Sequence, residues 1–335
     1  MAAYTTIDDP EAYFQVKLYT GTGSEIAATL DGDTNMSPNL VAIKARTDAE
    51  SHKVYDSVRG VTKHIEFDTG DAEATESEGL KSFDSDGFTI GTYSSINASD
   101  SHTYVAWCWK ESATSGFDIV SYTGNGSARA ISHSLSAVPS MMLVKNRGSG
   151  YGWQVYHHSN TSAPETEIMY LHDTNATADS NVEWNDTAPT SSVFTVGTDV
   201  GVNQTSTAMI AYLFTNVQGF SKFGSYVGNG NADGPYIHLG FRPAYILIKR
   251  TDSTGDWYIF DNKLIPQNVI TQYLTANKNE AVKNAVAAYY IDFLSNGFKL
   301  RGTGNENNAD GGTYIYAAFA EAPFVNSEGV PCNAR

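Results

Sequence analysis

The sequence FDIVSYTGNG at residues 117–126 decides the fold, because related versions of it occur twice more in the chain. The other versions are FQVKLYTGTG at residues 14–23 and FSKFGSYVGNG at residues 220–230. The phenylalanines that open them are spaced 103 positions apart: Phe14, Phe117 and Phe220. A fixed period of this length is the mark of an internal repeat, which has to be recognised before any fold is inferred.

Further landmarks follow each version in the same order. A proline begins an apolar strand that ends in lysine six positions later, as in Pro38–Lys44, Pro139–Lys145 and Pro243–Lys249. A short aromatic strand comes next. An apolar strand closes each copy, and its last residues lie 105 positions apart: Trp109, Phe214 and Phe319.

These landmarks predict three modules of roughly 100 residues each, at residues 12–110, 115–216 and 218–322. The flanking residues 1–11 and 323–335 are predicted to be an N-terminal and a C-terminal arm. Because the linkers are short, the modules are expected to pack against one another.

Each module is expected to be an all-β sandwich. Its landmark strands are four to eight residues long and are bounded by Gly, Pro, Asn or Ser, a pattern typical of sandwiches. In the closing strand YVAWCW, Val105, Trp107 and Trp109 alternate with Tyr104, Ala106 and Cys108, and both sets are largely apolar. This strand is therefore predicted to be central and covered on both faces.

Residues 269–284 could pass for an amphipathic helix by the spacing of their apolar residues. The aligned segment of the first module, residues 64–74, contains Gly70 and alternates apolar with polar residues. The alignment favours a strand and a loop over a helix at 269–284.

Composition excludes some classes of partner. The chain of 335 residues carries 37 acidic and 21 basic residues, for a formal charge of −16. Nucleic-acid binding needs clustered basic residues, and an anionic membrane surface would repel this chain. No apolar run approaches the roughly 18–20 residues that span a bilayer, so no membrane insertion is expected. Residues 1–10 lack the features of a signal peptide.

No cofactor is expected from the motifs present. The glycine pairs, such as Gly124 and Gly126, lack the third glycine and the helix of a phosphate-binding loop. Asn125-Gly126 and Asn229-Gly230 are better explained as hairpin turns, in which positive φ is needed. The two cysteines, Cys108 and Cys332, make neither a disulfide framework nor a zinc site.

Two kinds of candidate site remain. Trp153, Tyr156, Trp257 and Tyr258 recur on the aromatic strands, where they could stack on sugars or pack between two sheets. Asp31 and Asp33 lie on a tight acidic turn that could hold calcium, although the distal glutamate of a full calcium loop is missing.

Catalytic groups are harder to place. The eight histidines show no metal spacing, and the adjacent His157 and His158 are expected to be surface or turn residues. No acidic position recurs through all three modules, and GxSxG does not occur. A non-enzymatic protein is therefore expected.

Several segments together resemble a module widespread in tailed bacteriophages of marine bacteria. They include YTTIDDPEAYFQVKLYTGTG from Tyr4, DSVRG at residues 56–60, SFDSDGFTIG from Ser82 and YVAWCWK from Tyr104. The resemblance covers nearly the whole chain and implies a virion structural protein of the tail, fibre or minor structural kind. It implies no catalytic residues. Each module is also similar in length and pattern to concanavalin-like or jelly-roll sandwiches.

The resemblance leads to one functional expectation and two alternatives. The expectation is a non-enzymatic virion protein, made in the bacterial host cytoplasm, that forms a fibre, spike or decoration on the tail or head. Its expected partners are other virion proteins and copies of itself, with a homotrimer as the assembly. The first alternative is a host-attachment adhesin that binds surface glycans, and the second is a polysaccharide depolymerase.

Overall fold

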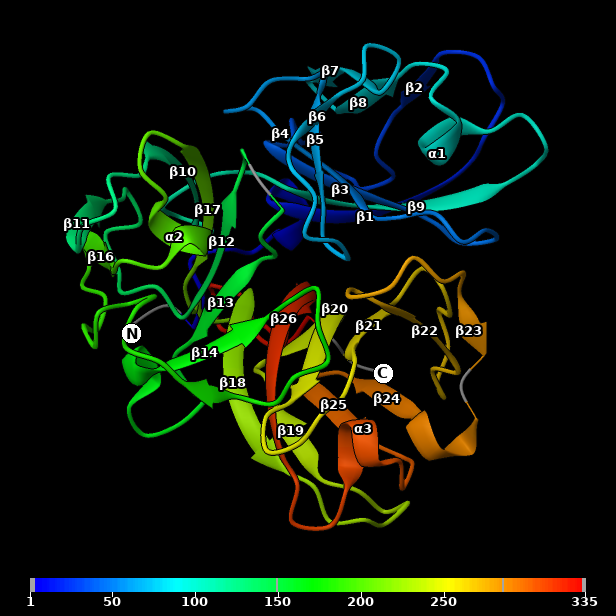
Figure 1. The fold of residues 1–335 in the computed structure, drawn as a ribbon. Coiled ribbons are helices and arrows are strands. Elements are labelled where there is room, and N and C mark those ends of the chain that lie inside the picture. The colour runs from blue at the N-terminus through cyan, green and yellow to red at the C-terminus, as the bar shows by residue number, and fades with distance from the viewer. Residues whose placement is uncertain (1–3, 149, 285, 333–335) are drawn as a thin grey trace.

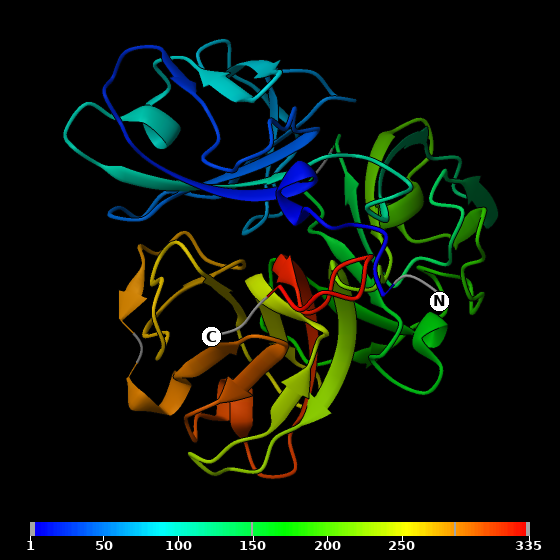
Figure 2. The same cartoon turned by 180° about the vertical axis from the view of Figure 1, so that it is seen from behind.

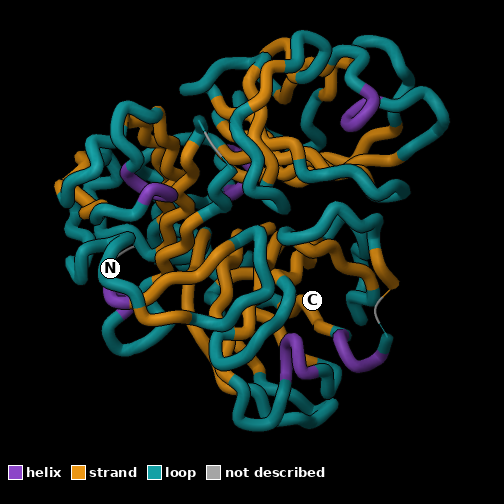
Figure 3. Tube along the Cα trace, in the orientation of Figure 1, coloured by secondary structure: helices purple, strands orange, loops and turns teal. Residues whose placement is uncertain are grey.

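The computed structural model describes residues 4–148, 150–284 and 286–332. Strands form its framework, and the helices are single short turns (Figure 3). The predicted all-β class is confirmed by several antiparallel sheets. Within the described residues, none of the helices has the length and apolar composition needed to cross a membrane.

The first hundred residues form two sheets. The larger has the order β1 (Phe14–Thr20), β9 (Thr103–Trp109), β3 (Leu40–Ala45), β4 (Lys53–Asp56), β5 (Lys63–Glu66) and β6 (Ala74–Thr75). The smaller has the order β2 (Ile26–Ala28), β8 (Gly87–Ile90) and β7 (Leu80–Asp84). Two short helices accompany them: η1 (Pro10–Ala12) and α1 (Ser94–Asn97).

The second hundred residues repeat this plan. The larger sheet has the order β10 (Phe117–Thr123), β17 (Ala208–Phe214), β12 (Met141–Asn146), β13 (Gln154–His157), β14 (Glu167–Tyr170) and β15 (Ala178–Asp179). The smaller sheet pairs β11 (Arg129–Ser132) with β16 (Val193–Val196). The helices are η2 (Pro164–Thr166) and α2 (Val200–Asn203).

The last part of the chain has the same plan of one larger and one smaller sheet. The larger sheet has the order β18 (Ser221–Val227), β26 (Thr313–Pro323), β20 (Phe241–Arg250), β21 (Trp257–Asp261), β22 (Gln272–Thr275) and β23 (Lys283–Asn284). The smaller sheet has the order β19 (Tyr236–His238), β25 (Gly297–Leu300) and β24 (Ile291–Leu294). The helices are η3 (Ala287–Tyr289) and α3 (Asn305–Asn308).

The three larger sheets therefore share one order of strands. In each, the opening strand pairs with the closing strand, which in turn pairs with the strand that follows the proline landmark. The register agrees in modules 1 and 2, where Phe14 lies opposite Trp109 and Phe117 lies opposite Phe214. In module 3 it is shifted by one residue, because Ser221 lies opposite Phe319. We refer below to residues 12–110, 115–216 and 218–322 as modules 1, 2 and 3.

The closing strand β9 is central, as predicted. Its residues Val105, Trp107 and Trp109 face a cluster that is common to all three modules. Its residues Tyr104, Ala106 and Cys108 face a second cluster between the larger and the smaller sheet of module 1. Module 2 has a matching inner cluster, whereas the inner residues of module 3 merge with the common one.

The glycine turns have the predicted positive φ but do not form hairpins. The φ values of Gly23, Gly126 and Gly230 are 66°, 73° and 62°. The turn in module 2 connects β10 of the larger sheet to β11 of the smaller sheet, and these two strands pair with other partners. It is therefore a crossing between sheets, which the local sequence could not distinguish from a hairpin.

Residues 269–284 contain strands β22 and β23 and no helix. Leu274 and Ala276 are buried in the common cluster, and β22 pairs with β21. The interpretation as a strand and a loop is confirmed, because the neighbouring strand β21 supplies the backbone partners that a helix would not need.

The two predicted arms lie against each other and against module 3. Ile7 is buried in the common cluster, and Thr5 Oγ1 donates a hydrogen bond to Gln218 O over 2.8 Å. Asp8 accepts hydrogen bonds from the backbone N–H and the hydroxyl of Ser327, which ties one arm to the other. Residues 1–3 and 333–335 of the arms lie outside the described residues.

The three modules lie around a common centre. Figure 1 shows module 1 in blue and cyan, module 2 in green and module 3 in yellow to red, and Figure 2 shows the same grouping from behind. Module 3 contacts module 1 as well as module 2, so the modules form a closed ring instead of an open row.

Candidate functional site: the junction of the three modules

The centre of the ring is aromatic. Phe14 stacks on Phe319 with ring centroids 5.1 Å apart, and Trp109 packs against both at 5.1 and 5.7 Å. Phe214 of module 2 lies 5.7 Å from Phe319. The residues that end the three closing strands, which are 105 positions apart in sequence, thus meet at one point.

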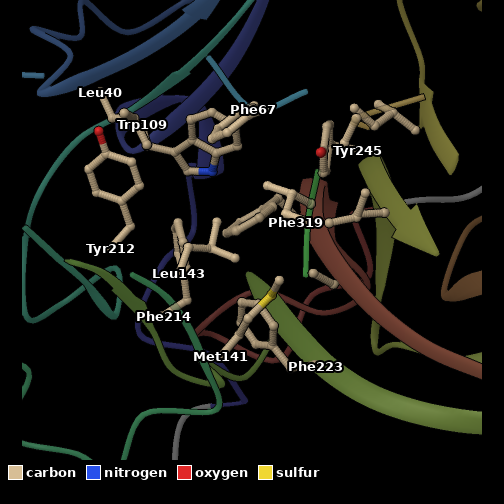
Figure 4. A pocket seen from close by; sticks show the side chains of 15 residues that line it. Leu40, Phe67, Trp109, Met141, Leu143, Tyr212, Phe214, Phe223, Tyr245 and Phe319 are labelled. Carbon is tan, nitrogen blue, oxygen red and sulfur yellow. The ribbon is translucent and has the colours of Figure 1, made fainter. Parts of the chain in front are cut away.

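A small cavity of about 40 Å³ remains between these side chains (Figure 4). Its walls come from all three modules and include Leu40, Met141, Leu143, Phe223 and Tyr245. A void of this size, with a lining that is almost entirely apolar, has too little room for an organic ligand. The centre of the ring is therefore a packed core shared by three modules.

The lysine that ends each apolar strand is buried and reaches into another module. The side chains are fully buried, and burial lowers the pKa of each amine to about 8. The three bonds are Lys44 Nζ to Asn279 O (3.1 Å), Lys145 Nζ to Gly70 O (2.9 Å) and Lys249 Nζ to Thr174 O (3.1 Å). Each amine thus donates to the equivalent loop of the preceding module in the ring.

A ring nitrogen at the start of the aromatic strand makes a second contact of this kind. Trp153 Nε1 donates to Glu66 O over 2.6 Å, and Trp257 Nε1 donates to Tyr170 O over 2.9 Å. The matching residue of module 1 is His52, whose Nε2 lies 2.9 Å from Thr275 O. All three rings are buried.

The expectation that Trp153 and Trp257 stack on sugars is therefore corrected. Their exposed fractions are 0% and 1%, because their rings close the boundary between two modules. Tyr156, at 4%, packs on Trp184 between the sheets of module 2, and Tyr258, also at 4%, packs on Tyr273. In this conformation no ligand can reach the ring faces of these residues.

The residue that ends the aromatic strand makes a third contact, toward the following module. Asp56 Oδ2 accepts from Tyr212 OH over 2.6 Å, and Asp261 Oδ2 accepts from Trp107 Nε1 over 3.2 Å. His157 holds this place in module 2, with its Nε2 3.1 Å from Tyr316 O. His157 is buried at the end of β13, so the expectation of a surface or turn residue was wrong for it, whereas His158 lies in the turn that follows.

A backbone hydrogen bond completes each boundary. The bonds join Glu73 N to Arg147 O, Thr177 N to Thr251 O and Val282 N to Arg46 O, each at 2.9 Å. The same four kinds of contact thus occur at all three boundaries. A head-to-tail contact between unlike surfaces forms a ring when its repetition brings the last unit back to the first. The three modules of this one chain are therefore arranged like the subunits of a ring-shaped trimer.

The DSVRG segment lies at the boundary of modules 1 and 2. Burial disfavours the charged guanidinium of Arg59, but Tyr212, Asp56 and Glu73 outweigh burial and raise its pKa further. Arg59 Nε bonds Asp56 Oδ2 over 2.5 Å, and Nη2 donates to Val54 O. The segment departs from the other modules because it holds an ion pair that they lack.

Glu73 extends this pair across the boundary. Its two carboxylate oxygens accept from Arg147 Nε and Nη2 over 2.8 and 3.1 Å, in the fork geometry that favours arginine. Glu73 also lies 3.4 Å from Arg59 Nη1. The boundary of modules 1 and 2 is thus the most highly charged of the three.

One recurring polar residue was missed from the sequence. Asn97, Asn203 and Asn308 end the short helices and are fully buried. Each donates to two backbone carbonyls and accepts a backbone N–H from the first glycine turn, as when Asn203 Oδ1 accepts from Asn125 N over 2.9 Å. Their spacing of 106 and 105 positions matches the period of the repeat and marks them as equivalent residues. The residues around them differ between modules, so the match was not recognised from the sequence.

The calcium alternative receives no support from the side chains around it. Asp31 is paired with Lys17 over 2.5 Å, and the backbone N–H of Asp33 donates to Glu11. Within the described residues, no three His, Cys, Asp or Glu side chains are grouped so that they could hold a metal ion.

Comparison with known families gives one match. A family model described as a domain of unknown function, DUF7483, matches residues 9–323, which is most of the chain. The chain therefore belongs to that family. A comparison with curated proteins finds no match.

Proposed function

We propose that this member of the DUF7483 family is a non-enzymatic virion structural protein, built from three tandem β-sandwich modules, that forms a fibre, spike or decoration on a bacteriophage tail or head. The resemblance of its repeated segments to modules of marine tailed phages supports the assignment to a virion. The fold gives the proposal its physical content, because it explains how one chain could serve as a rigid building block.

The closed ring of equivalent contacts is the observation that carries this proposal. Lys44, Lys145 and Lys249 recur at the end of the same landmark strand, and each donates a hydrogen bond to a neighbouring module. A row of three modules joined by loops would bend at each linker. Closure of the ring removes that freedom, because each module is held by two neighbours.

The expected partners are other virion proteins and further copies of this chain, with a homotrimer as the proposed assembly. The junction surfaces are already filled within one chain, so such partners would bind the outer loops. Those loops differ from module to module and carry exposed apolar side chains such as Val58, Val138 and Val286. Three unlike sets of loops on one rigid body suit a site with several different neighbours.

The test uses purified particles of a phage that encodes this chain. Quantitative mass spectrometry is expected to find the chain at a fixed copy number, and immunogold labelling is expected to place it at one location on the tail or head. Native mass spectrometry of the isolated protein is expected to show an oligomer, with three copies as the proposed number. Absence from washed particles together with a monomer at high concentration would overturn the proposal.

Host attachment through surface glycans is the second candidate function. The buried Trp153 and Trp257 cannot carry it, but an open polar hollow in module 2 can, as argued below. Incubation of the protein with host polysaccharide separates this candidate from a depolymerase. Binding without release of reducing ends supports an adhesin, and release of reducing ends would support the enzyme.

A further inference from the structure

One structurally equivalent position of the three modules is packed by different side chains in each module. It lies where the aromatic strand pairs with the next strand of the larger sheet, close to the start of the short helix. The paired residues are Lys53 with Glu66 in module 1, Gln154 with Tyr170 in module 2, and Tyr258 with Thr275 in module 3. We refer to it as the strand-pair position.

In module 1 this position is filled by an ion pair. Lys53 bonds to Glu66, and its amine also lies 5.7 Å from the centre of the Tyr93 ring. Tyr93 is the residue that precedes helix α1. A charge and an aromatic ring of the module itself thus occupy the space.

In module 3 the same position is filled by tyrosines. The ring of Tyr258 lies 4.8 Å from that of Tyr273 and 5.6 Å from that of Tyr289. The Tyr289 ring covers Gly304, the residue that precedes helix α3, so closely that an added Cβ would lie 2.3 Å from it. Here too the module closes the position with its own side chains.

In module 2 the position is open. A hollow of about 290 Å³ lies there, and its walls include Tyr151, Gln154, Tyr170, His172, Asp173 and Asp199. Asp199 precedes helix α2, in the place of Tyr93 in module 1. The volume of the hollow is close to the smallest volume, about 300 Å³, of pockets that bind small molecules.

The walls of this hollow hold polar atoms without partners. Gln154 is 5% exposed, and its Oε1 has no hydrogen-bond partner among the described residues. The same is true of His172 Nδ1. Both atoms are buried beneath the walls, so a ligand in the hollow would contact the partly exposed side chains of Tyr151, Asp173 and Asp199 instead.

The backbone beside the hollow is held by close contacts within module 2. The His172 ring lies directly over Gly152, where an added Cβ would be 1.7 Å from the imidazole. Lys145, the junction lysine of module 2, donates a hydrogen bond to Tyr151 O and so holds the rim in place. The hollow is therefore built on the same rigid frame as the boundary between modules 1 and 2.

The chemistry of the walls points to one class of ligand. Asp199 Oδ1 caps helix α2 by accepting from Gly201 N over 2.7 Å, and Asp173 accepts from Thr174 N over 2.6 Å. Carboxylates are hydrogen-bond acceptors, so these two side chains favour a ligand rich in donors. Tyr151 is 39% exposed and offers a ring on which an apolar sugar face can stack.

We propose that the hollow of module 2 binds a neutral saccharide, with sugar hydroxyl groups donating to the carboxylates of Asp173 and Asp199 and with one sugar face on Tyr151. Acidic sugars are disfavoured by the two carboxylates and by the formal charge of −16. Modules 1 and 3 do not bind sugar at this position, because their own side chains fill it. The proposal goes beyond the structural role and does not depend on where the chain lies in a virion.

Saturation-transfer NMR on the full chain with glucose, galactose, mannose and N-acetylglucosamine tests this proposal. At least one sugar is expected to show saturation transfer. Tyr151→Ala is expected to weaken its binding at least tenfold, and Asp173→Asn is expected to weaken it as well. Tyr236→Ala, which removes an exposed tyrosine of module 3, is the matched control and is expected to leave binding unchanged.

Absence of transfer from all four sugars at tens of millimolar would overturn the proposal, as would equal binding by the wild type and the Tyr151→Ala variant. Preference for glucuronic acid over the neutral sugars would contradict the ligand class. Because the measurement uses the isolated chain, a negative result leaves the particle experiment on the virion role independent of it.

Discussion

The three boundaries between modules use the same positions with different chemistry. Modules 1 and 2 meet through Asp56 and Tyr212 beside a buried arginine, whereas modules 3 and 1 meet through Asp261 and Trp107. Modules 2 and 3 meet through a neutral histidine, His157, on a backbone carbonyl. The comparison shows that backbone geometry, which every copy inherits, fixes where contacts form, while the side chains that make them have diverged.

Charge should decide how sensitive each boundary is. Removing one partner of a buried ion pair leaves an uncompensated charge, whereas removing a neutral hydrogen bond costs less. The boundary of modules 1 and 2 should therefore respond most strongly to substitution.

The largest effect is expected from Arg59→Met. It leaves the buried carboxylate of Asp56 without its cation, whereas Glu73 keeps its pair with Arg147, and the cost is about 3–5 kcal/mol in the free energy of unfolding. Urea unfolding measures the loss. The control is Arg301→Met, whose side chain is 41% exposed and which should cost less than about 1 kcal/mol. Equal losses in the two variants would contradict the ranking.

A smaller effect is expected from Asp261→Asn at the boundary of modules 3 and 1. The carboxylate accepts from Trp107 Nε1 and from the backbone of Lys263 and Leu264, so an amide turns one acceptor into a donor. The cost should be about 1–3 kcal/mol. Asp252→Asn, in a partly exposed pair, is the control for urea unfolding. If Asp261→Asn left the free energy of unfolding unchanged, this contact would contribute little to stability.

The boundary of modules 2 and 3 should be sensitive to acid. Burial lowers the pKa of His157 to about 3, so the folded state keeps a neutral ring while the unfolded state gains a proton below pH 6.5. The unfolded state binds more protons than the folded state between pH 6.5 and 3. The free energy of unfolding therefore decreases as the pH is lowered through that window.

Between pH 6.5 and 5 this one residue should remove about 1.5 kcal/mol of stability. His157→Gln is expected to abolish that part of the slope in urea unfolding at several pH values. His238→Gln, at an exposed position, should keep it. An unchanged slope in His157→Gln would mean that the ring titrates normally in the folded protein.

The smallest effect is expected away from every boundary. Val227 is 57% exposed, and Val227→Ser should change the free energy of unfolding by less than about 0.5 kcal/mol. A larger loss in urea unfolding would indicate that the exposed end of strand β18 contributes stability that the comparison assigns to the junctions.

The repeat, the strand landmarks and the central position of β9 could be predicted because they depend on apolar patterns within the chain. Trp107 and Tyr104 alternate between two cores as the period of a strand requires. The spacing of the three copies was enough to set the order of the landmarks.

The junction could not be predicted in the same way. The acceptors for Lys145 and Trp153 are backbone carbonyls, which every residue has, so no side chain at Gly70 or Glu66 marks them. A buried tryptophan that donates across a boundary has the same local sequence as one that faces a ligand. The hollow beside Tyr151 was also invisible, since it exists only because Gln154 replaces the ion pair and tyrosines of the other modules.

Calorimetry of the whole chain tests most directly whether the three modules are one closed body. The account predicts a single thermal transition whose van't Hoff enthalpy equals the calorimetric enthalpy, because the unfolding of any one module exposes the cluster that all three share. It also predicts that Arg59→Met moves this whole transition to lower temperature. Two or three separate transitions, with only the first displaced by Arg59→Met, would contradict it.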